Sequence, residues 1–378
     1  MTKTAQLLCD LIALPSVNPA FLAPGDPHAG EARVADFLAG MARRARLDVE
    51  LQPVLPDRSN LVVRLAPCGR VRRRVMLVPH LDTVGGAQLP GTLLTPRLKA
   101  GRLFGRGACD TKGSVAAMLM AVFDLAEAGA RPAHTEFIFA GLVDEESSQA
   151  GSRALAASGI EAELAIVGEP TRLKVVTAHK GAVWLRLQTK GKAAHGARPE
   201  LGHNAIHAMA RIVDLLETQY AARLRHRRHP LLGHATINVG SILGGRQANI
   251  VPDECSILID RRTLPGETQA GVFGELRILL RQHNFRATMR SIQGGICGPM
   301  ETDAQKPIVQ ELFRSIGQKK PVGVDYFSDA GVLSAAGIPS VVFGPGDIAQ
   351  AHTSNEWISL RQLERAKDLL VRFMGRLE

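Results

Sequence analysis

Four short apolar runs constrain the fold of this 378-residue chain more than any other feature. They cover residues 74–79, 137–143, 164–167 and 340–343. Because they are nearly continuous rather than alternating, they are typical of strands buried on both faces, as in a parallel sheet. Apolar residues at helical spacing lie between the first two runs, over 111–128, and again after Ser359. The chain therefore predicts an α/β fold with a mostly parallel sheet covered by helices.

The middle of the chain has a different pattern. Apolar and polar residues alternate over 182–188 and 255–260, with a helical stretch over 204–217 between them. Strands paired around a helix indicate a smaller α+β domain, and the α/β pattern resumes after it, which is typical of an insertion. The predicted domains are residues 1–178 with 291–378, and the inserted residues 179–290.

The charge balance raises nucleic acid as a partner, because 46 basic residues against 36 acidic ones give a net charge of +10. The basic residues are scattered apart from two clusters, 70–74 and 223–229. Aromatic residues make up only 4% of the chain, so neither cluster carries the interleaved stacking residues of a single-strand binder. We expect both clusters to be solvated surface and predict no nucleic-acid partner.

The sequence also predicts a cytoplasmic protein with no membrane partner. Its apolar runs are far shorter than the roughly 18–20 uncharged residues that span a bilayer, and the N-terminal residues lack the features of a signal peptide. The five cysteines follow no regular spacing, so no disulfide framework is expected.

Side chains that bind metals follow the predicted strands. Open α/β sheets hold their ligands beyond the carboxyl ends of strands, so side chains at those positions are expected to meet. Two histidines with several carboxylates suit two divalent ions that share one carboxylate, in an environment typical of zinc. The candidates are His80 and Asp82 after the first run, Asp110 before the first helix, Glu145 and Glu146 after the second run, Glu169 after the third and His352 after the fourth.

Other interpretations of these residues stay open at this point. Each acid alone is more typical of a solvated loop end or a helix cap, so only the joint pattern points to metal. Cys109 stands beside Asp110, but soft-ligand sites normally show several spaced Cys or His, so a packed thiol is expected. Lys112 is expected to support the same loop.

Five segments, taken in order, resemble the motifs of the M20 metallopeptidases: VPHLDTV at 78–84, GRGACDTKG at 105–113, DEE at 144–146, VGEPT at 167–171 and AH at 351–352. The chain resembles the acetylornithine deacetylase and succinyl-diaminopimelate desuccinylase branch of that family along essentially its whole length. This resemblance implies a zinc exopeptidase-like catalytic domain that carries an inserted dimerisation, or lid, domain.

The resemblance also implies roles for the residues at the strand ends. Asp110 matches the carboxylate that bridges two Zn²⁺ ions, for which Co²⁺ is an alternative, and Asp82 matches the acid that orients the first histidine. Glu145 matches the general base for a water that the two metal ions activate. The residues that match the family's metal ligands are His80, Asp110, Glu146, Glu169 and His352.

In the inserted domain, the segment 191–199 resembles the motif whose histidine reaches the active site of the partner subunit. His195 would then stabilise the oxyanion in a homodimer, although Gly196 stands where the family usually has Ser. By the same resemblance, Asn249 and Arg262 are expected to bind the carboxylate of the substrate. Arg261, its neighbour on the same strand, should face the other way and be structural.

The resemblance implies a hydrolase that cleaves the amide bond of an N-acyl amino acid. Residues 343–352 are similar to acetylornithine deacetylases, and 328–331 lack the Arg of the desuccinylase segment, which favours a short neutral acyl group. A carboxypeptidase or dipeptidase, or a desuccinylase-like deacylase, is the alternative within the family. From other classes, we weighed a metal-free binding protein and a nucleic-acid binder. Loss of activity to a chelator would separate the hydrolase from both.

Overall fold

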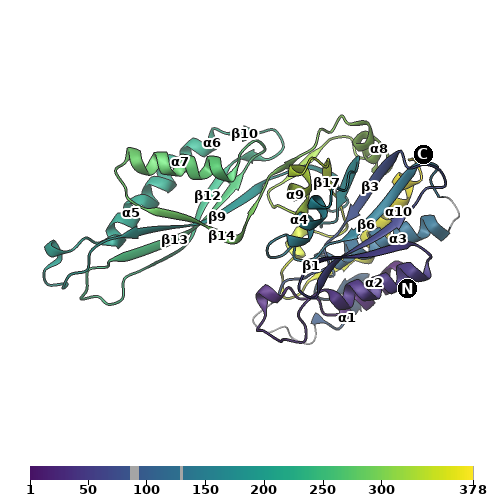
Figure 1. Cartoon of the computed structure of the whole chain (residues 1–378), viewed down its shortest axis with the longest axis horizontal. Helices are drawn as coiled ribbons and strands as arrows, with labels where there is room; N and C mark the ends of the chain where they lie inside the picture. The colour runs from purple at the N-terminus through teal and green to yellow at the C-terminus, as the bar shows by residue number, and fades with distance from the viewer. Residues whose placement is uncertain (86–92, 128–130, 378) are drawn as a thin grey trace. The chain divides into compact units, whose positions relative to one another are not determined.

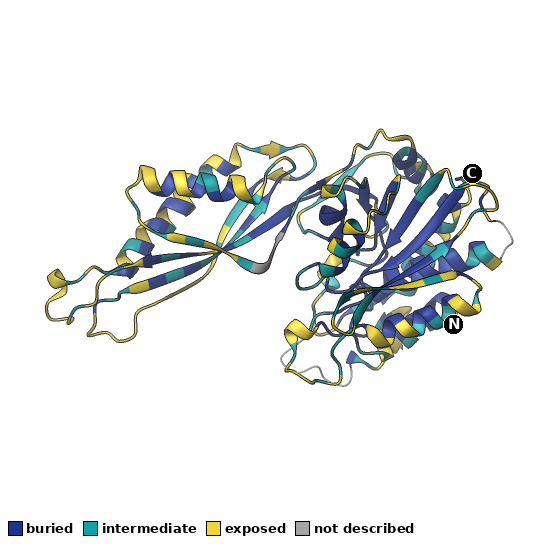
Figure 2. Ribbon diagram, viewed as in Figure 1, coloured by how far each residue is buried: buried dark blue, intermediate teal, exposed yellow. Residues whose placement is uncertain are grey.

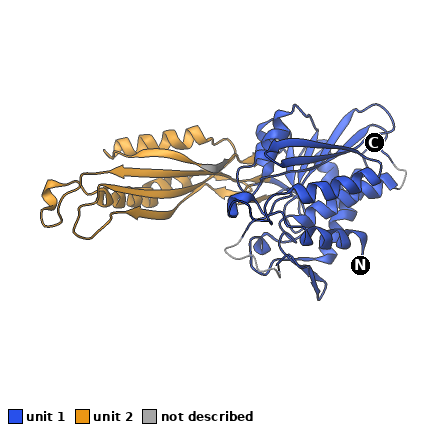
Figure 3. Cartoon of the chain, turned by 60° about the horizontal axis from the view of Figure 1, so that its bottom comes forward, with its two compact units in different colours: residues 1–177, 301–322, 328–378 blue, residues 178–300, 323–327 orange. Residues whose placement is uncertain are grey.

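The computed structural model describes residues 1–85, 93–127 and 131–377, and the contacts divide the chain into two compact units (Figure 3). Unit 1 comprises Met1–Thr177, Glu301–Val322 and Ser328–Glu378, and unit 2 comprises Ala178–Met300 and Gly323–Phe327. The sequence placed the second boundary at residue 290, whereas strand β14, Thr288–Cys297, carries unit 2 further along the chain.

Unit 1 is built on a nine-stranded sheet in the part of the chain that the structure describes (Figure 1). Its four central strands are parallel and follow the spatial order β6 (Thr135–Gly141), β3 (Arg73–Val78), β7 (Leu164–Val167) and β17 (Ser340–Val342). They coincide with the four apolar runs. The outer strands are β1 (Asp48–Leu55) and β2 (Arg58–Leu65) beside β6, and β8 (Val176–His179), β15 (Met300–Glu301) and β16 (Val322–Val324) beyond β17.

Helices cover both faces of this sheet, because alternate side chains of each strand point to opposite faces. Leu77, Phe139 and Ile166 share one core with α1 (Lys3–Ala13), α2 (Ala32–Arg44), α3 (Lys112–Glu127), α8 (Pro307–Ile316) and α10 (Leu360–Met374). On the other face, α4 (Ala150–Ala157) contacts α9 (Asp329–Ala335), which contacts β7 and β17. The predicted α/β fold with a helix-covered sheet is confirmed.

Smaller elements complete unit 1. The three-stranded sheet β18 (Trp357–Ser359), β5 (Arg102–Phe104) and β4 (Arg97–Lys99) connects the start of α10 to the segment before Asp110. Short 3-10 turns span Pro19–Phe21 and Ile348–Gln350. Among the residues described, none of the helices is both long enough and apolar enough for a membrane span.

Unit 2 is a four-stranded antiparallel sheet with helices on one face (Figure 2). The strand order is β12 (Thr236–Gly244), β13 (Glu254–Thr263), β9 (Gly181–Lys190) and β14. Alternate residues such as Leu185 and Ile257 are buried against α5 (Ala205–Leu215), α6 (Ala221–Arg225) and α7 (Gln269–Gln282). A π-helical turn, Leu216–Tyr220, joins α5 to α6, a 3-10 turn spans Pro199–Leu201, and β10 (Arg228–His229) pairs with β11 (Gly233–His234).

Arg261 and Arg262 point to opposite faces of β13, as their adjacent positions predict. Arg261 is fully buried on the helix side, and its guanidinium lies 2.6 Å from the Glu267 carboxylate. Arg262 is partly exposed on the open face. The alternation of the strand therefore assigns Arg261 to the core of unit 2 and leaves Arg262 accessible.

Candidate metal centre

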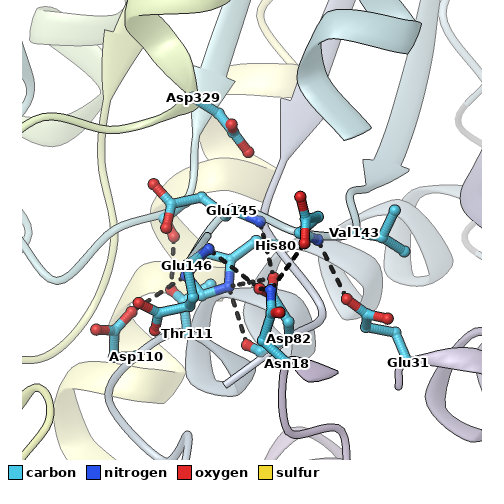
Figure 4. Close-up of polar contacts among 12 residues, drawn as sticks. Asn18, Glu31, His80, Asp82, Asp110, Thr111, Val143, Glu145, Glu146 and Asp329 are labelled. Carbon is cyan, nitrogen blue, oxygen red and sulfur yellow. Dashed lines mark hydrogen bonds and ion pairs between the residues drawn. The ribbon is translucent and has the colours of Figure 1, made fainter. Parts of the chain in front are cut away.

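Five side chains from separate segments, four of them in loops after strands and Asp110 just before α3, converge at one edge of the sheet in unit 1. They form two groups of three, in which the ligand atoms lie within 4.8 Å of one another: His80, Asp110 and Glu169, and Asp110, Glu146 and His352. Nε2 of His80 lies 3.1 Å from Oδ1 of Asp110, and Nε2 of His352 lies 3.1 Å from Oδ2 of the same carboxylate. Asp110 thus belongs to both groups, with one oxygen facing each histidine; Figure 4 shows its carboxylate beside His80.

The chemistry of these groups fits two divalent cations. Each group offers one imidazole nitrogen and two carboxylates, which is a set of ligands typical of Zn²⁺. Burial, and then the negative charge of Asp110, raise the pKa of Glu146 to about 7, and burial raises the pKa of Glu169 well above its usual range. Without added positive charge, the site therefore holds more buried carboxylates than can all be ionised. Bound cations would supply that charge.

His352 leaves this centre open on one side. Its side chain is 55% exposed, whereas that of Glu146, 3.2 Å away, is only 7% exposed. The contacts with Asp110 and Glu146 raise the pKa of His352 to about 10. The rim of this otherwise buried cluster therefore lies at His352.

Asp82 joins the first strand end to the second. The ring of His80 lies against it, with Nδ1 3.0 Å from the Asp82 carbonyl oxygen and 3.4 Å from Oδ1. The two carboxylate oxygens of Asp82 accept hydrogen bonds from the backbone amides of Glu145 and Glu146, at 3.1 and 3.0 Å. Burial acts to raise the pKa of Asp82, but its contacts with His80, Asn18 and the Glu146 amide outweigh this effect and lower the pKa. Asp82 is therefore an ionised acceptor behind His80.

A sharp turn brings Glu145 and Glu146 to the same site, although neighbours on an extended strand face opposite ways. Asp144, just past β6, has φ 69° and so lies in the left-handed region. Figure 4 shows the side chains of both glutamates leaving this turn, with Asp329 near Glu145. Burial raises the pKa of Glu145 well above its usual range, and the charges of Glu169, Asp329 and Glu146 act in the same direction. Glu145 is thus a half-buried carboxylate with high proton affinity.

Sequence reasoning assigned no role to several residues that build this site. Glu356 is 1% exposed and accepts hydrogen bonds from the amides of Gly107, Cys109 and Asp110, at 3.0, 2.8 and 2.9 Å. It therefore holds the loop that presents the shared carboxylate. Asp329 is 1% exposed, accepts a hydrogen bond from the Ser152 hydroxyl at 2.6 Å, and has a pKa that burial raises to about 6.

Two neighbours of Asp110 have the surroundings of structural residues. The Cys109 thiol is buried and donates to the Asp347 carbonyl at 3.3 Å, and burial raises its pKa. The Lys112 ammonium donates to the carbonyls of Leu11 and Leu14 at 2.8 and 2.7 Å, which satisfies the end of α1. Burial lowers the pKa of Lys112 to about 7.

The remaining predicted site residues lie in unit 2, in two separate places. His195 and Asn249 are adjacent, since the Gly196 amide donates to the Asn249 carbonyl at 2.7 Å and His195 pairs with Ile250. A Cβ at Gly196 would lie 2.9 Å from that carbonyl, which explains why this chain has Gly there. Arg262 pairs with Asp260 at 3.0 Å and lies over the ring of Phe327, 5.4 Å from its centroid.

The two places are at opposite ends of the sheet of unit 2. Arg262 lies opposite Ala182 at the start of β9, whereas the segment with His195 follows Lys190 at its end. A strand rises about 3.3 Å per residue, so the ends are about 26 Å apart. A small molecule cannot contact both ends of one sheet.

Two proteins of known name are similar to this chain over most of its length. Acetylornithine deacetylase of Myxococcus xanthus is 31% identical over 353 residues, which cover 89% of this chain and 90% of that protein. Acetylornithine deacetylase of Proteus mirabilis is 32% identical over 377 residues, covering 97% of this chain and 94% of that protein.

Solved structures share the fold. The aminopeptidase PepT of Bacillus cereus matches with a TM-score of 0.79 at 21% identity, over 99% of this chain and 98% of that one. A Bacillus subtilis protein described as a dinuclear metal binding peptidase matches with a TM-score of 0.70 at 13% identity, over 98% and 96% of the two chains. Residues 76–376 match the model of peptidase family M20/M25/M40. The chain therefore belongs to peptidase family M20/M25/M40.

Proposed function

We propose that this M20 hydrolase cleaves the amide bond of N-acyl amino acids with a short neutral acyl group, as an acetylornithine deacetylase-like enzyme. The observation that carries the proposal is the pair of ligand groups that share Asp110, with Glu145 on the adjoining turn. The names of the two relatives support the substrate class. The absence of Arg from residues 328–331 supports a neutral acyl group.

Each metal ion would be held by one group of three residues. His80 and Glu169 would hold one ion, Glu146 and His352 the other, and Asp110 both. The likeness to the dinuclear metal binding peptidase of Bacillus subtilis supports a centre of two ions. We propose Zn²⁺ as the occupant, with Co²⁺ able to replace it. When bound, such ions supply Lewis acidity, which polarises an amide carbonyl and makes water easier to deprotonate.

Glu145 would act as the general base. It would accept the proton of the attacking water and then deliver that proton to the nitrogen of the departing amine. Burial raises the pKa of Glu145 above its ordinary value, which strengthens it as a proton acceptor. Asp82 would keep His80 oriented with Nε2 towards the ligand group.

The residues of unit 2 would recognise the rest of the substrate. Arg262 would bind the carboxylate of the amino acid through its planar guanidinium, replacing its contact with Asp260. His195 would stabilise the oxyanion, and Asn249 would assist in holding the substrate. Because these two sets of residues lie about 26 Å apart in one chain, we propose that a second copy supplies His195 and Asn249, in a homodimer formed through unit 2.

The free edge of β12 supports this homodimer. Among the described strands, β12 pairs on one side with β13 and stands at the edge of the sheet. It carries Ile242 and Leu243, which are 56% and 78% exposed. An unpaired edge with exposed apolar side chains is a template for strand pairing with another chain.

Ile242→Asp is expected to convert the dimer to a monomer, because a charge on the paired edge would be desolvated. Activity should fall at least roughly 10-fold in the monomer, since removing oxyanion donors costs at least that much. Sedimentation velocity and kcat check both effects. Ile278→Asp is the matched control, since Ile278 is also 56% exposed but lies on α7. A monomeric parent with full activity would contradict the proposal.

A panel of N-acetyl amino acids, N-succinyl amino acids and dipeptides tests the substrate class. The zinc-loaded protein is expected to hydrolyse the N-acetyl compounds with a kcat/KM at least roughly 10-fold above the others, about 1.4 kcal/mol of transition-state discrimination. A preference of that size for dipeptides would instead identify a peptidase. A preference for N-succinyl compounds would identify a desuccinylase.

A further inference from the structure

Four successive backbone amides of the turn at 143–146 donate to buried side-chain oxygens, not to another strand. The Val143 amide donates to Oδ1 of Asn60, and the Asp144 amide donates to Oε1 of Glu31, each at 3.1 Å. The amides of Glu145 and Glu146 donate to Oδ1 and Oδ2 of Asp82, at 3.1 and 3.0 Å. Asp82 also contacts His80, which is a proposed metal ligand. Asn60 and Glu31 instead accept from the amides of Val143 and Asp144, which are not proposed ligands. Through these bonds they hold the backbone of the turn.

A buried ion pair stabilises this arrangement. Nε of Arg58 lies 2.7 Å from Oε2 of Glu31, and its NH2 group lies 2.5 Å from Oε1. The same NH2 group is 3.0 Å from Oδ1 of Asp144. The side chain of Glu31 is 0% exposed and that of Arg58 is 11% exposed. Arg58 therefore compensates the two carboxylates, Glu31 and Asp144, that hold the start of the turn.

Asn60 holds both ends of the same loop. Besides accepting from Val143, it donates through Nδ2 to the carbonyl of Gly151, at 2.9 Å. Arg58 and Asn60 are two residues apart on β2, so their side chains leave the same face of the strand. Between the two bonded ends, Asp144 has its left-handed φ of 69°. Such a conformation is uncommon for residues other than Gly and persists where its surroundings hold it in place.

We infer that Glu31, Arg58 and Asn60 are positioning residues, which hold the turn so that Glu145 and Glu146 both enter the site. The inference rests on the proposed function, in which Glu145 is the base and Glu146 a metal ligand. Small displacements of reacting groups are costly, since about 1 Å of misplacement can lower a rate by about 100-fold. A residue that acts only on fold stability would leave the rate per folded molecule unchanged.

The double variant Glu31→Leu with Arg58→Met separates positioning from stability. Replacing a whole buried ion pair by apolar residues of similar volume is often neutral or stabilising, whereas removing one partner leaves a buried charge. The double variant removes no net charge, and the Asp144 carboxylate keeps its hydrogen bonds from the Asn18 side chain and the Ser148 amide, at 3.0 and 3.2 Å, so it is expected to stay folded. It loses the acceptor for the Asp144 amide and the cation beside the Asp144 carboxylate.

For this variant, kcat on an N-acetyl amino acid is expected to fall about 10–100-fold, with KM changed less than about 3-fold. Zinc affinity, measured by competition with a chromogenic chelator, should fall by a similar factor for one of the two ions, because Glu146 serves one ion only. Asn60→Leu should act in the same direction. Gln318→Leu is its control: Gln318 also bonds a backbone amide and carbonyl, those of Val175, at 2.8 and 2.9 Å, but that segment carries no site residue.

These measurements also distinguish the inference from the proposed function. If the parent enzyme hydrolyses no N-acyl amino acid, the proposed function is wrong, and zinc affinity still tests the inference. If the folded double variant and the Asn60→Leu variant both keep kcat and both zinc affinities within about 2-fold of the parent, the three residues do not position the turn. Equal losses in the Gln318→Leu variant would overturn the inference as well, since they would reflect general destabilisation.

Discussion

Glu145→Gln is expected to lower kcat by about 10²–10⁴-fold, the range that a positioned general base contributes. The carboxamide has nearly the shape of the carboxylate but cannot accept the proton of the attacking water. The hydrogen bond from the Glu145 amide to Asp82 is a backbone contact and is kept in the variant. Bound metal should therefore remain at the parent level, because Glu145 belongs to neither ligand group.

This prediction is checked by kcat at saturating substrate, together with elemental analysis of the purified variant. Glu163→Gln is a suitable control, because Glu163 pairs with Arg73 at 2.7 Å on the surface and is 40% exposed. It should keep full activity. A Glu145→Gln variant that hydrolyses substrate as fast as the parent would remove the general base from the mechanism. One that loses its metal would show that Glu145 is a ligand.

Removal of metal is expected to abolish activity and to make stability fall as pH rises. In the metal-free protein, burial raises the pKa of Glu146 from 4.5 to about 7. A raised pKa means that the folded state binds the proton more tightly than the unfolded state, so this stabilisation is complete below about pH 4.5 and is lost as pH rises through about 7. The pKa of His352, raised from 6.5 to about 10 by Asp110 and Glu146, acts in the same direction at higher pH.

The thermal midpoint of the metal-free protein should therefore be lower at about pH 8 than at about pH 5.5. Zinc should reverse this trend, because its ligands bind in their deprotonated forms. At free zinc roughly 1,000-fold above the dissociation constant, one site adds about 4 kcal/mol of stability. Differential scanning calorimetry with and without chelator measures the difference, and restored activity on adding zinc or cobalt completes the test.

Asp110→Asn provides the control for metal removal, because it weakens the carboxylate that both groups share. Its thermal midpoint should respond little to chelator or to zinc. A parent protein that stays fully active in excess chelator would contradict the metal-dependent mechanism. If the thermal midpoint of the metal-free protein did not depend on pH, the negative charge of the buried carboxylates would have to be balanced by other groups of the protein.

Much of the fold could be predicted, because each central strand is buried on both faces. The runs 74–79, 137–143, 164–167 and 340–343 overlap β3, β6, β7 and β17, and the helical pattern at 111–128 overlaps α3. The boundary at 290 was harder to place. Residues 293–295 of β14 read Gln-Gly-Gly, which weakens the alternation that marks a strand, although β14 continues to Cys297.

The sequence by itself determined which side chains can bind metal and at which strand ends they stand. His80 and Glu169 lie just past the ends of β3 and β7, and Glu146 lies in the turn after β6; the carboxyl ends of parallel strands must meet at one edge. Local pattern is sufficient there, because a few neighbouring residues indicate both that the strand is buried and where it ends.

Only the tertiary structure decided how those side chains are held. Glu31 lies 113 residues from Asp144, Asn60 lies 83 residues from Val143, and Glu356 lies 246 residues from Asp110. A single buried acid or amide has no periodicity and no spacing that indicates its partner. Its role arises because packing of distant elements leaves backbone amides without water, and each such amide must find an acceptor.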